Sequence, residues 1–153
     1  MFKRIAKVLI CTMLVMSVLL PSVCFADYGL TIPADAVGTH SDIITIKRPE
    51  SLSASTSDKT YTISATGAQG TKIKVYKYIP SENIGKLVIN ERAIGASGLY
   101  SSVLDLTSDN NTFIVYAENQ TGTQVVKISI NKIKKSTIDR LKSLTVTIKN
   151  FLS

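Results

Sequence analysis

The chain has 153 residues, of which 44% are hydrophobic and 19% are charged, and its formal net charge is +7. Its two cysteines, Cys11 and Cys24, both lie near the N-terminus. Without residues 1–26 the chain has no disulfide, thiol nucleophile or thiolate metal ligand, which excludes the class of small disulfide-stapled proteins. Residues 27–153 are enough for one domain that is stabilised by a buried core.

Residues 1–26 have the layout of a secretory signal peptide. Basic residues precede an apolar run over residues 8–20, Pro21 breaks that run, and small residues at Cys24 and Ala26 suit cleavage after Ala26. An uncleaved membrane anchor would need about 20 apolar residues. The sequence therefore predicts a protein that is secreted or associated with the cell envelope.

Residues 27–41 lack periodicity and contain Gly29, Pro33 and Gly38. Such a composition is typical of a linker or of a loosely docked arm.

Residues 42–133 alternate apolar and polar residues, which predicts β-strands. The predicted strands cover residues 44–46, 60–66, 71–78, 86–89, 99–106, 112–118 and 124–133. Segments rich in Gly, Asn, Asp and Ser separate them, and the polar stretch Thr107–Asn111 is interpreted as a turn. Because no helical segments lie between the strands, we expect an all-β antiparallel sandwich of about seven strands.

The C-terminal segment, residues 134–153, is basic. From Lys127 onward the chain holds seven basic residues and one acidic residue, Asp139. Ser136 and Asp139 resemble a capping box, and apolar residues recur at helical spacing from Ile138 to Phe151, so we expect an amphipathic helix. The candidate surface-binding residues of this tail are Lys134, Lys135, Arg140, Lys142 and Lys149.

Two interpretations of the tail stay open. A basic amphipathic helix is typical of a segment that binds an anionic membrane or wall polymer. Alternatively, its apolar stripe docks on the sandwich and covers the face that carries Tyr76. Nucleic acid is not an expected partner for an exported chain.

Three segments, GAQGTKIKVY, ASGLYSSVLDL and SDNNTFIVYAENQTG, resemble the bacterial immunoglobulin-like domains of secreted and cell-surface proteins. The matching positions are Gly67, Gly70, Thr71, Gly98, Tyr100, Leu104, Leu106, Asn111, Thr112, Phe113, Val115, Ala117 and Gly122. The resemblance covers residues 43–133 and implies a seven-stranded sandwich that serves as a spacer or adhesion module without catalytic residues. Many members carry Asp in the turn after the Ala strand, whereas this chain has Glu118-Asn119-Gln120, which puts a calcium ion at that turn in doubt.

One face of the predicted sheet is a candidate binding surface for protein or glycan. The strands at 71–78, 112–118 and 123–131 would be neighbours, and alternation places tyrosines and lysines on their outer side. The candidate residues are Lys72, Lys74, Tyr76, Tyr78, Ile114, Tyr116 and Lys127, with Val125 beside them. The alternative interpretation is that Tyr and Val are good strand formers and that Lys protects an exposed sheet.

The sequence predicts that the chain has no catalytic, cofactor-binding or metal-binding residues. His40 is the single histidine and lies in the 27–41 segment, where we expect a solvated loop residue. A calcium ion shared by Asp105, Asp109 and Glu118 at one end of the sandwich stays an alternative. A small glycan-processing hydrolase would need two acids that converge in a cleft.

The sequence as a whole predicts a signal peptide (1–26), a linker (27–41), an Ig-like β-sandwich (42–133) and a basic C-terminal helix (134–153). We expect a secreted, non-enzymatic interaction or structural module at the bacterial cell envelope or surface.

Overall fold

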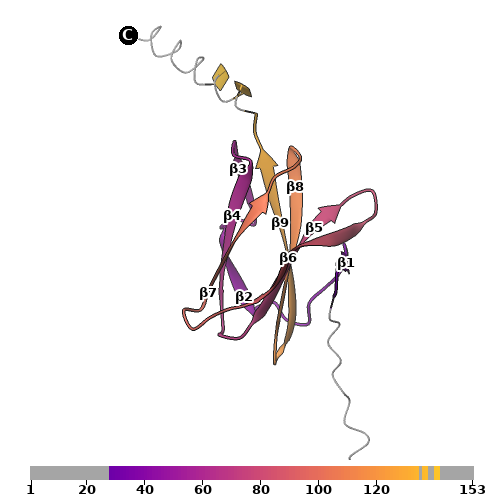
Figure 1. Ribbon diagram of the computed structural model, residues 1–153, viewed down its shortest axis with the longest axis vertical. Coiled ribbons are helices and arrows are strands. Elements are labelled where there is room, and N and C mark those ends of the chain that lie inside the picture. The colour runs from indigo at the N-terminus through magenta and orange to yellow at the C-terminus, as the bar shows by residue number, and fades with distance from the viewer. Residues whose placement is uncertain (1–27, 135, 138–139, 142–153) are drawn as a thin grey trace, which may run out of the picture.

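The structure, a computed structural model, describes residues 28–134, 136–137 and 140–141. The strands, which all lie within residues 31–132, form two β-sheets (Figure 1). The strands are β1 (Thr31–Pro33), β2 (Ile44–Arg48), β3 (Ser53–Thr56), β4 (Thr60–Gly67), β5 (Lys72–Ile79), β6 (Ile84–Ala93), β7 (Leu99–Asp105), β8 (Asn110–Asn119) and β9 (Gly122–Lys132). The expectation of an all-β chain is confirmed for this part of the chain.

The six-stranded sheet has the order β1-β6-β5-β8-β9-β3, and the three-stranded sheet has the order β2-β4-β7. Every strand pair is antiparallel except β3 and β9, which are parallel. The expectation that the strands at 71–78, 112–118 and 123–131 are neighbours is confirmed, because β8 pairs with β5 on one side and with β9 on the other.

Alternate apolar residues of both sheets form the main core. Ile63 and Ala65 of β4 point inward and pack with residues of the six-stranded sheet such as Ile73 and Val75 of β5. This is the packing that a period of two produces, since successive side chains of a strand lie on opposite faces.

The described residues form nine strands where about seven were expected. The two additional strands are β1, which lies within the segment interpreted as a linker or arm, and β3. β3 has the sequence SAST, which is short and polar and therefore carries little strand signal. It pairs in parallel with β9, a contact between residues distant in sequence.

Residues 106–109 connect β7 to β8, so the turn interpretation holds for the first part of Thr107–Asn111, whereas Asn110 and Asn111 already belong to β8. The buried side chain of Asn111 donates from Nδ2 to the carbonyl of Ser108 at 2.7 Å and accepts from the amide of Ser108 at 3.2 Å. The polar stretch is thus a corner that its own amide side chain stabilises.

The predicted signal peptide lies outside the described residues. So do Lys135, Lys142 and Lys149 of the predicted C-terminal helix, whereas Lys134 and Arg140 belong to the described part and are exposed.

Candidate functional site

The residues of the predicted binding face do lie on one side of the six-stranded sheet. In the β5–β8 pair Lys74 is opposite Tyr116 and Tyr76 is opposite Ile114. In the β8–β9 pair Ile114 is opposite Lys127, which extends the face across a third strand.

The expectation that this face is exposed is wrong at its centre. Tyr76 and Ile114 are 0% exposed, Tyr116 is 1% exposed and Lys74 is 8% exposed. Tyr76, Ile114 and Tyr116 form a second hydrophobic cluster, separate from the main core, to which Ile32 also belongs. The predicted tyrosine and lysine surface is therefore largely an interior.

The cover is residues 28–40, which we call the N-terminal arm. At one end the amide of Leu87 in β6 donates to the carbonyl of Leu30, at 2.9 Å. At the other end the amide of His40 donates to the carbonyl of Thr123 in β9, also at 2.9 Å. Since β5 and β8 lie between β6 and β9, the arm crosses the outer side of both.

The arm contributes apolar side chains to the cluster it covers. Ile32 is 0% exposed, and burying an aliphatic side chain of this size contributes about 1.5–3 kcal/mol. The ring of Tyr28 meets that of Tyr116 edge to face, with centroids 5.4 Å apart. The arm is thus part of the folded domain and covers the apolar outer side of β5 and β8.

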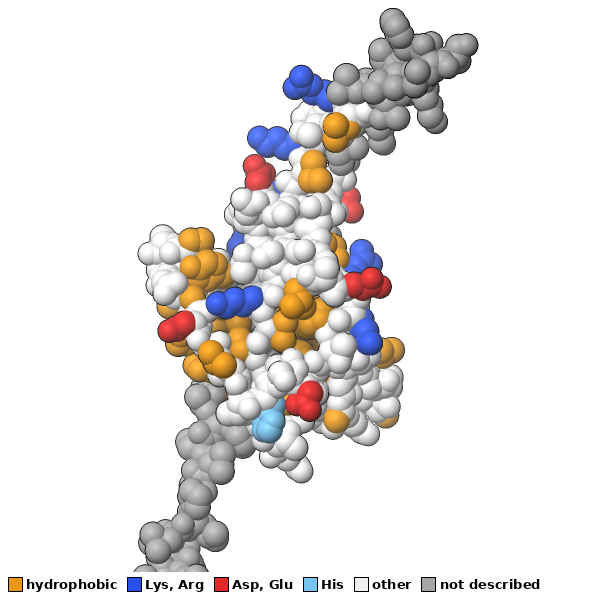
Figure 2. Space-filling model, turned by 180° about the vertical axis from the view of Figure 1, so that it is seen from behind, with side chains coloured by type: hydrophobic (Ala, Val, Ile, Leu, Met, Phe, Trp, Pro, Cys, Tyr) orange, Lys and Arg blue, Asp and Glu red, His pale blue; other side chains and the backbone are white. Residues whose placement is uncertain are grey.

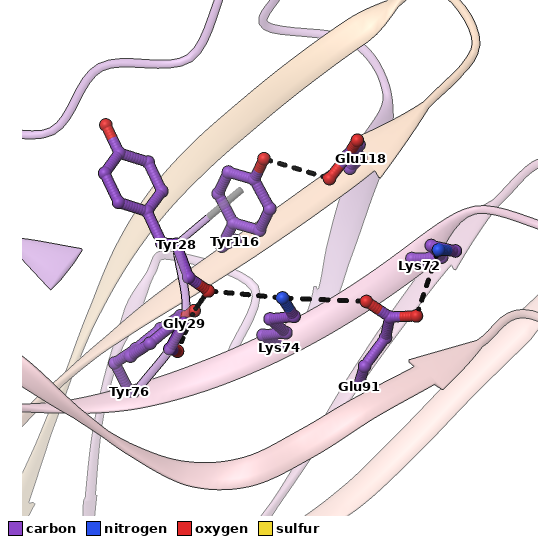
Figure 3. A network of polar contacts seen from close by, with 8 residues as sticks. All are labelled: Tyr28, Gly29, Lys72, Lys74, Tyr76, Glu91, Tyr116 and Glu118. Carbon is purple, nitrogen blue, oxygen red and sulfur yellow. Dashed lines mark hydrogen bonds and ion pairs between the residues drawn. The ribbon is translucent and has the colours of Figure 1, made fainter. Parts of the chain in front are cut away.

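Polar side chains fix the start of the arm (Figure 3). The hydroxyl of Tyr76 donates to the carbonyl of Tyr28 at 2.6 Å and is 3.2 Å from that of Gly29. Lys74 Nζ donates to the same Tyr28 carbonyl at 3.2 Å. The arm therefore satisfies the phenol and the ammonium group that it buries.

The cation of Lys74 has a second partner. Glu91 of β6 lies 3.6 Å from Lys74 Nζ and 3.1 Å from Lys72 Nζ, so one carboxylate joins two lysines of the predicted face (Figure 3). The Glu91 side chain is 40% exposed, and an ion pair this accessible adds little to stability. Its effect is to orient Lys74 beneath the arm.

Two glycines allow the arm to approach the sheet closely. A Cβ at Gly85 in β6 would lie 2.6 Å from Cγ2 of Ile32. A Cβ at Gly38 in the arm would lie 2.5 Å from the Cα of Gln124 in β9. Both distances are shorter than carbon atoms tolerate, so the absence of a side chain at these positions is required for the contact.

Part of the predicted face stays accessible beside the arm. Tyr78 and Lys127 line a hollow of about 280 Å³, which we call the Tyr78 hollow. The other lining residues are Ala34, Asp35, Asn83 and Thr112. The hydroxyl of Tyr78 donates to Asn83 Oδ1 at 3.1 Å, which fixes the ring. The hollow combines an aromatic ring with a cation, a carboxylate, an amide and a hydroxyl.

The calcium alternative is wrong in its geometry. Asp109 precedes β8 and Glu118 lies near its other end, so the two carboxylates lie at opposite ends of a ten-residue strand. At about 3.3 Å per residue they are tens of ångströms apart. Within the described residues there is no group of three or more His, Cys, Asp or Glu side chains that is able to hold a metal ion.

His40 is exposed, as expected, and lies on the surface at the turn between β8 and β9 (Figure 2). Elsewhere on the face in that view, basic and acidic side chains are interspersed.

A second hollow lies where the chain leaves β9. It has a volume of about 520 Å³, and Lys59, Lys132 and Lys134 line it together with Asp58. Lys59 and Lys132 of the sandwich therefore lie beside Lys134, the first residue of the basic tail. Among the described residues there is no helix long and apolar enough to cross a membrane.

Sequence reasoning allowed a loosely docked arm at residues 27–41 but did not predict that it covers the Tyr76 face, because the signal for this contact is indirect. Tyr76, Ile114 and Tyr116 are large and apolar at positions that alternation assigns to the outer face, and a solvated sheet face is normally polar there. Such a face requires a cover, and the preceding segment contains Ile32 and Ala34, which are both buried. The chain itself therefore contained the cover for its predicted surface.

Comparison with known proteins gives no relatives: no family model matches the chain, and no curated protein or solved structure is significantly similar to it.

Proposed function

We propose that the chain is a secreted Ig-like interaction module of the bacterial cell envelope or surface that acts by binding and not by catalysis. Its binding site is the Tyr78 hollow, and its ligand is an envelope glycan.

The strand order supports the Ig-like assignment. In Ig domains strands A, B, E and D form one sheet and strands C, F and G form the other, with C′ beside C in the longer type. Assigning β2, β4, β5, β6, β7, β8 and β9 to A, B, C, C′, E, F and G reproduces these neighbours, and no described strand takes the place of D.

The observation that carries the binding proposal is the set of groups in the Tyr78 hollow. An aromatic ring offers a flat apolar face to the C–H groups of a sugar ring, and its orientation is fixed by Asn83. Lys127, Asp35 and Thr112 supply donors and acceptors for sugar hydroxyls around that ring.

The test is binding of residues 27–153 to a panel of isolated envelope polysaccharides. We expect Tyr78→Ala to weaken binding at least tenfold and Lys127→Ala to weaken it less, because the ring supplies the larger contact area. The control is Lys47→Ala, which removes an exposed lysine of β2 in the other sheet. Equal binding by Tyr78→Ala and the parent, with unchanged thermal unfolding, would contradict the glycan site.

A second candidate function is binding of an anionic membrane or wall polymer through the basic tail. The observation that favours it is the end of the sandwich where Lys59, Lys132 and Lys134 surround one hollow. The charges of Lys59 and Lys132 add to that of Lys134, where the tail begins, and this local positive charge would attract a phosphate-rich surface.

The test is sedimentation with vesicles that contain either anionic or only neutral lipid. We expect residues 27–153 to bind the anionic vesicles, to lose this binding as salt is raised and to lose it on deletion of residues 134–153. Lys47→Ala is again the control, since it removes one positive charge elsewhere. Binding that survives the deletion at low salt would exclude the tail.

A further inference from the structure

The two sheets have four end strands, β1 and β3 in one sheet and β2 and β7 in the other. An end strand presents unpaired backbone N–H and C=O groups, to which another strand can pair. Proteins protect such edges with short strands, proline, charged side chains or register shifts.

Three of the four end strands have this protection. β1 has three residues and ends at Pro33, and β3 has four residues. β2 carries Lys47 and Arg48 and shifts its register against β4 between Ile46 and Arg48.

β7 has none of these protective features. It is seven residues long, has the sequence LYSSVLD and carries no charge before Asp105. It pairs with β4 without a register shift from Leu99 to Asp105. Its other edge has no strand beside it among the described residues (Figure 1).

The unprotected edge is also apolar. Leu99 is 63% exposed and Val103 is 54% exposed, and both lie on the outer face of β7. Beside the strand lies a cleft of about 210 Å³ that separates β7 from β6. Its lining includes Val88, Ile89, Val103, Leu104 and Phe113.

We propose that β7 pairs with β7 of a second copy of this chain, antiparallel and about a two-fold axis at Ser101. In this register Leu99 of each copy lies opposite Val103 of the other, so four exposed apolar side chains meet across the new pair. A register one residue further along, centred on Ser102, would instead place Leu99 opposite Asp105. Of these two registers, the one centred on Ser101 brings the exposed apolar side chains together.

The charges are compatible with this arrangement. In the Ser101-centred register Asp105 lies opposite Ser97 of the other copy and no two like charges face one another. Each copy contributes its one unpaired β7 edge to the pair. Because the remaining end strands are protected, assembly stops at a closed dimer.

The dimer is expected to be weak. One strand pair with four apolar side chains falls at the small end of interfaces, below the roughly 1,200–2,000 Å² of stable complexes. The dimer proposal does not depend on the Tyr78 hollow, which lies on the other sheet. The dimer and the glycan site are therefore tested independently of each other.

The first test is sedimentation equilibrium of residues 27–153 over a wide concentration range. We expect the apparent mass to double toward high concentration and Val103→Lys to abolish this rise, because a cation would then lie opposite Leu99 of the partner. The matched control is Val37→Lys, which places a lysine at an 83% exposed position of the arm. A parent chain that stays monomeric throughout overturns the proposal, whether or not its edge binds a foreign extended peptide.

The second test locates the contact. Residues 27–153 contain no cysteine, so Ser101→Cys places one thiol per chain at the axis, within the distance that a disulfide bridges. We expect this variant to form a covalent dimer under mild oxidation and Thr62→Cys, on β4 of the same sheet, to form none. Equal cross-linking by both variants overturns the Ser101 register.

Discussion

The two outer faces of the sandwich come from strands with the same alternation and are treated differently by the fold. The outer positions of β4 are Thr60, Thr62, Ser64 and Thr66, and the described residues leave this face uncovered. The outer positions of β5 and β8 include Tyr76, Ile114 and Tyr116, and the N-terminal arm covers them. Hydroxyl side chains are compatible with water, whereas large apolar ones gain by leaving it. The kind of residue on the outer face therefore decides whether a sheet needs a third layer.

The largest effect is expected from removing the cover's apolar side chain. Ile32→Ala should lower the free energy of unfolding by about 2–5 kcal/mol, the range for an aliphatic side chain lost from a packed interior. Urea unfolding of residues 27–153 measures it. Val37→Ala on the same arm, at 83% exposure, should change stability by less than about 0.5 kcal/mol. If the two variants unfold alike, the arm is not part of the cooperative structure.

A smaller effect is expected from preventing the close approach. Gly85→Ala places a methyl group against Ile32 and should cost about 1–3 kcal/mol, the range for overpacking. Hydrogen exchange at the amides of Leu87 and His40, which hold the two ends of the arm, should accelerate. Gly95→Ala is the control because a Cβ there would meet no atom within 4 Å. Unchanged exchange in Gly85→Ala would contradict the docked arm.

A still smaller loss of stability is expected from removing the Tyr76 hydroxyl, which anchors the arm. Tyr76→Phe removes the donor to the carbonyls of Tyr28 and Gly29 and should cost about 0.5–1.5 kcal/mol, measured by urea unfolding. Tyr78→Phe removes an exposed hydroxyl contact on the same strand and should cost less. A greater loss for Tyr78→Phe would mean that the anchor lies in the Tyr78 hollow.

The smallest effect on stability is expected from Tyr100, which is buried in the core between the two sheets. Burial raises the pKa of Tyr100 above its ordinary value of 10.0, while Ser102 and Arg92 act in the opposite direction. The Tyr100 hydroxyl therefore loses its proton at lower pH in the unfolded chain than in the folded chain. Because deprotonation favours the unfolded state, the free energy of unfolding falls as the pH rises above about 10. Tyr100→Phe should reduce the slope of the melting temperature against pH in that range. An identical slope in the variant would show that Tyr100 does not titrate differently in the two states.

The sequence predicted the inner side of the sandwich well. Each of the seven predicted strands corresponds to a strand of the structure, and inward residues such as Ile63 and Val75 are buried as alternation requires. It did not predict β3 or β1, the strand within the arm, because neither has a local pattern: β3 is held by β9, and β1 is held by β6.

The candidate site was predicted only in part. Tyr78 and Lys127 line an accessible hollow, whereas Tyr76 and Tyr116 from the same predicted surface are buried. Alternation states which face of a sheet a residue occupies but not what lies above that face. That depends on contacts such as Tyr76 with Tyr28, which join residues far apart in the chain.

The sequence by itself determined the all-β class, the strand period and the division between inward and outward residues, because these follow from the geometry of one strand and its neighbours along the chain. Only the tertiary structure decided that residues 28–40 close over Tyr76 and that β7 has β4 as its single neighbour among the described strands. Covering a face and ending a sheet are properties of segments brought together by folding, and no period within either segment encodes them.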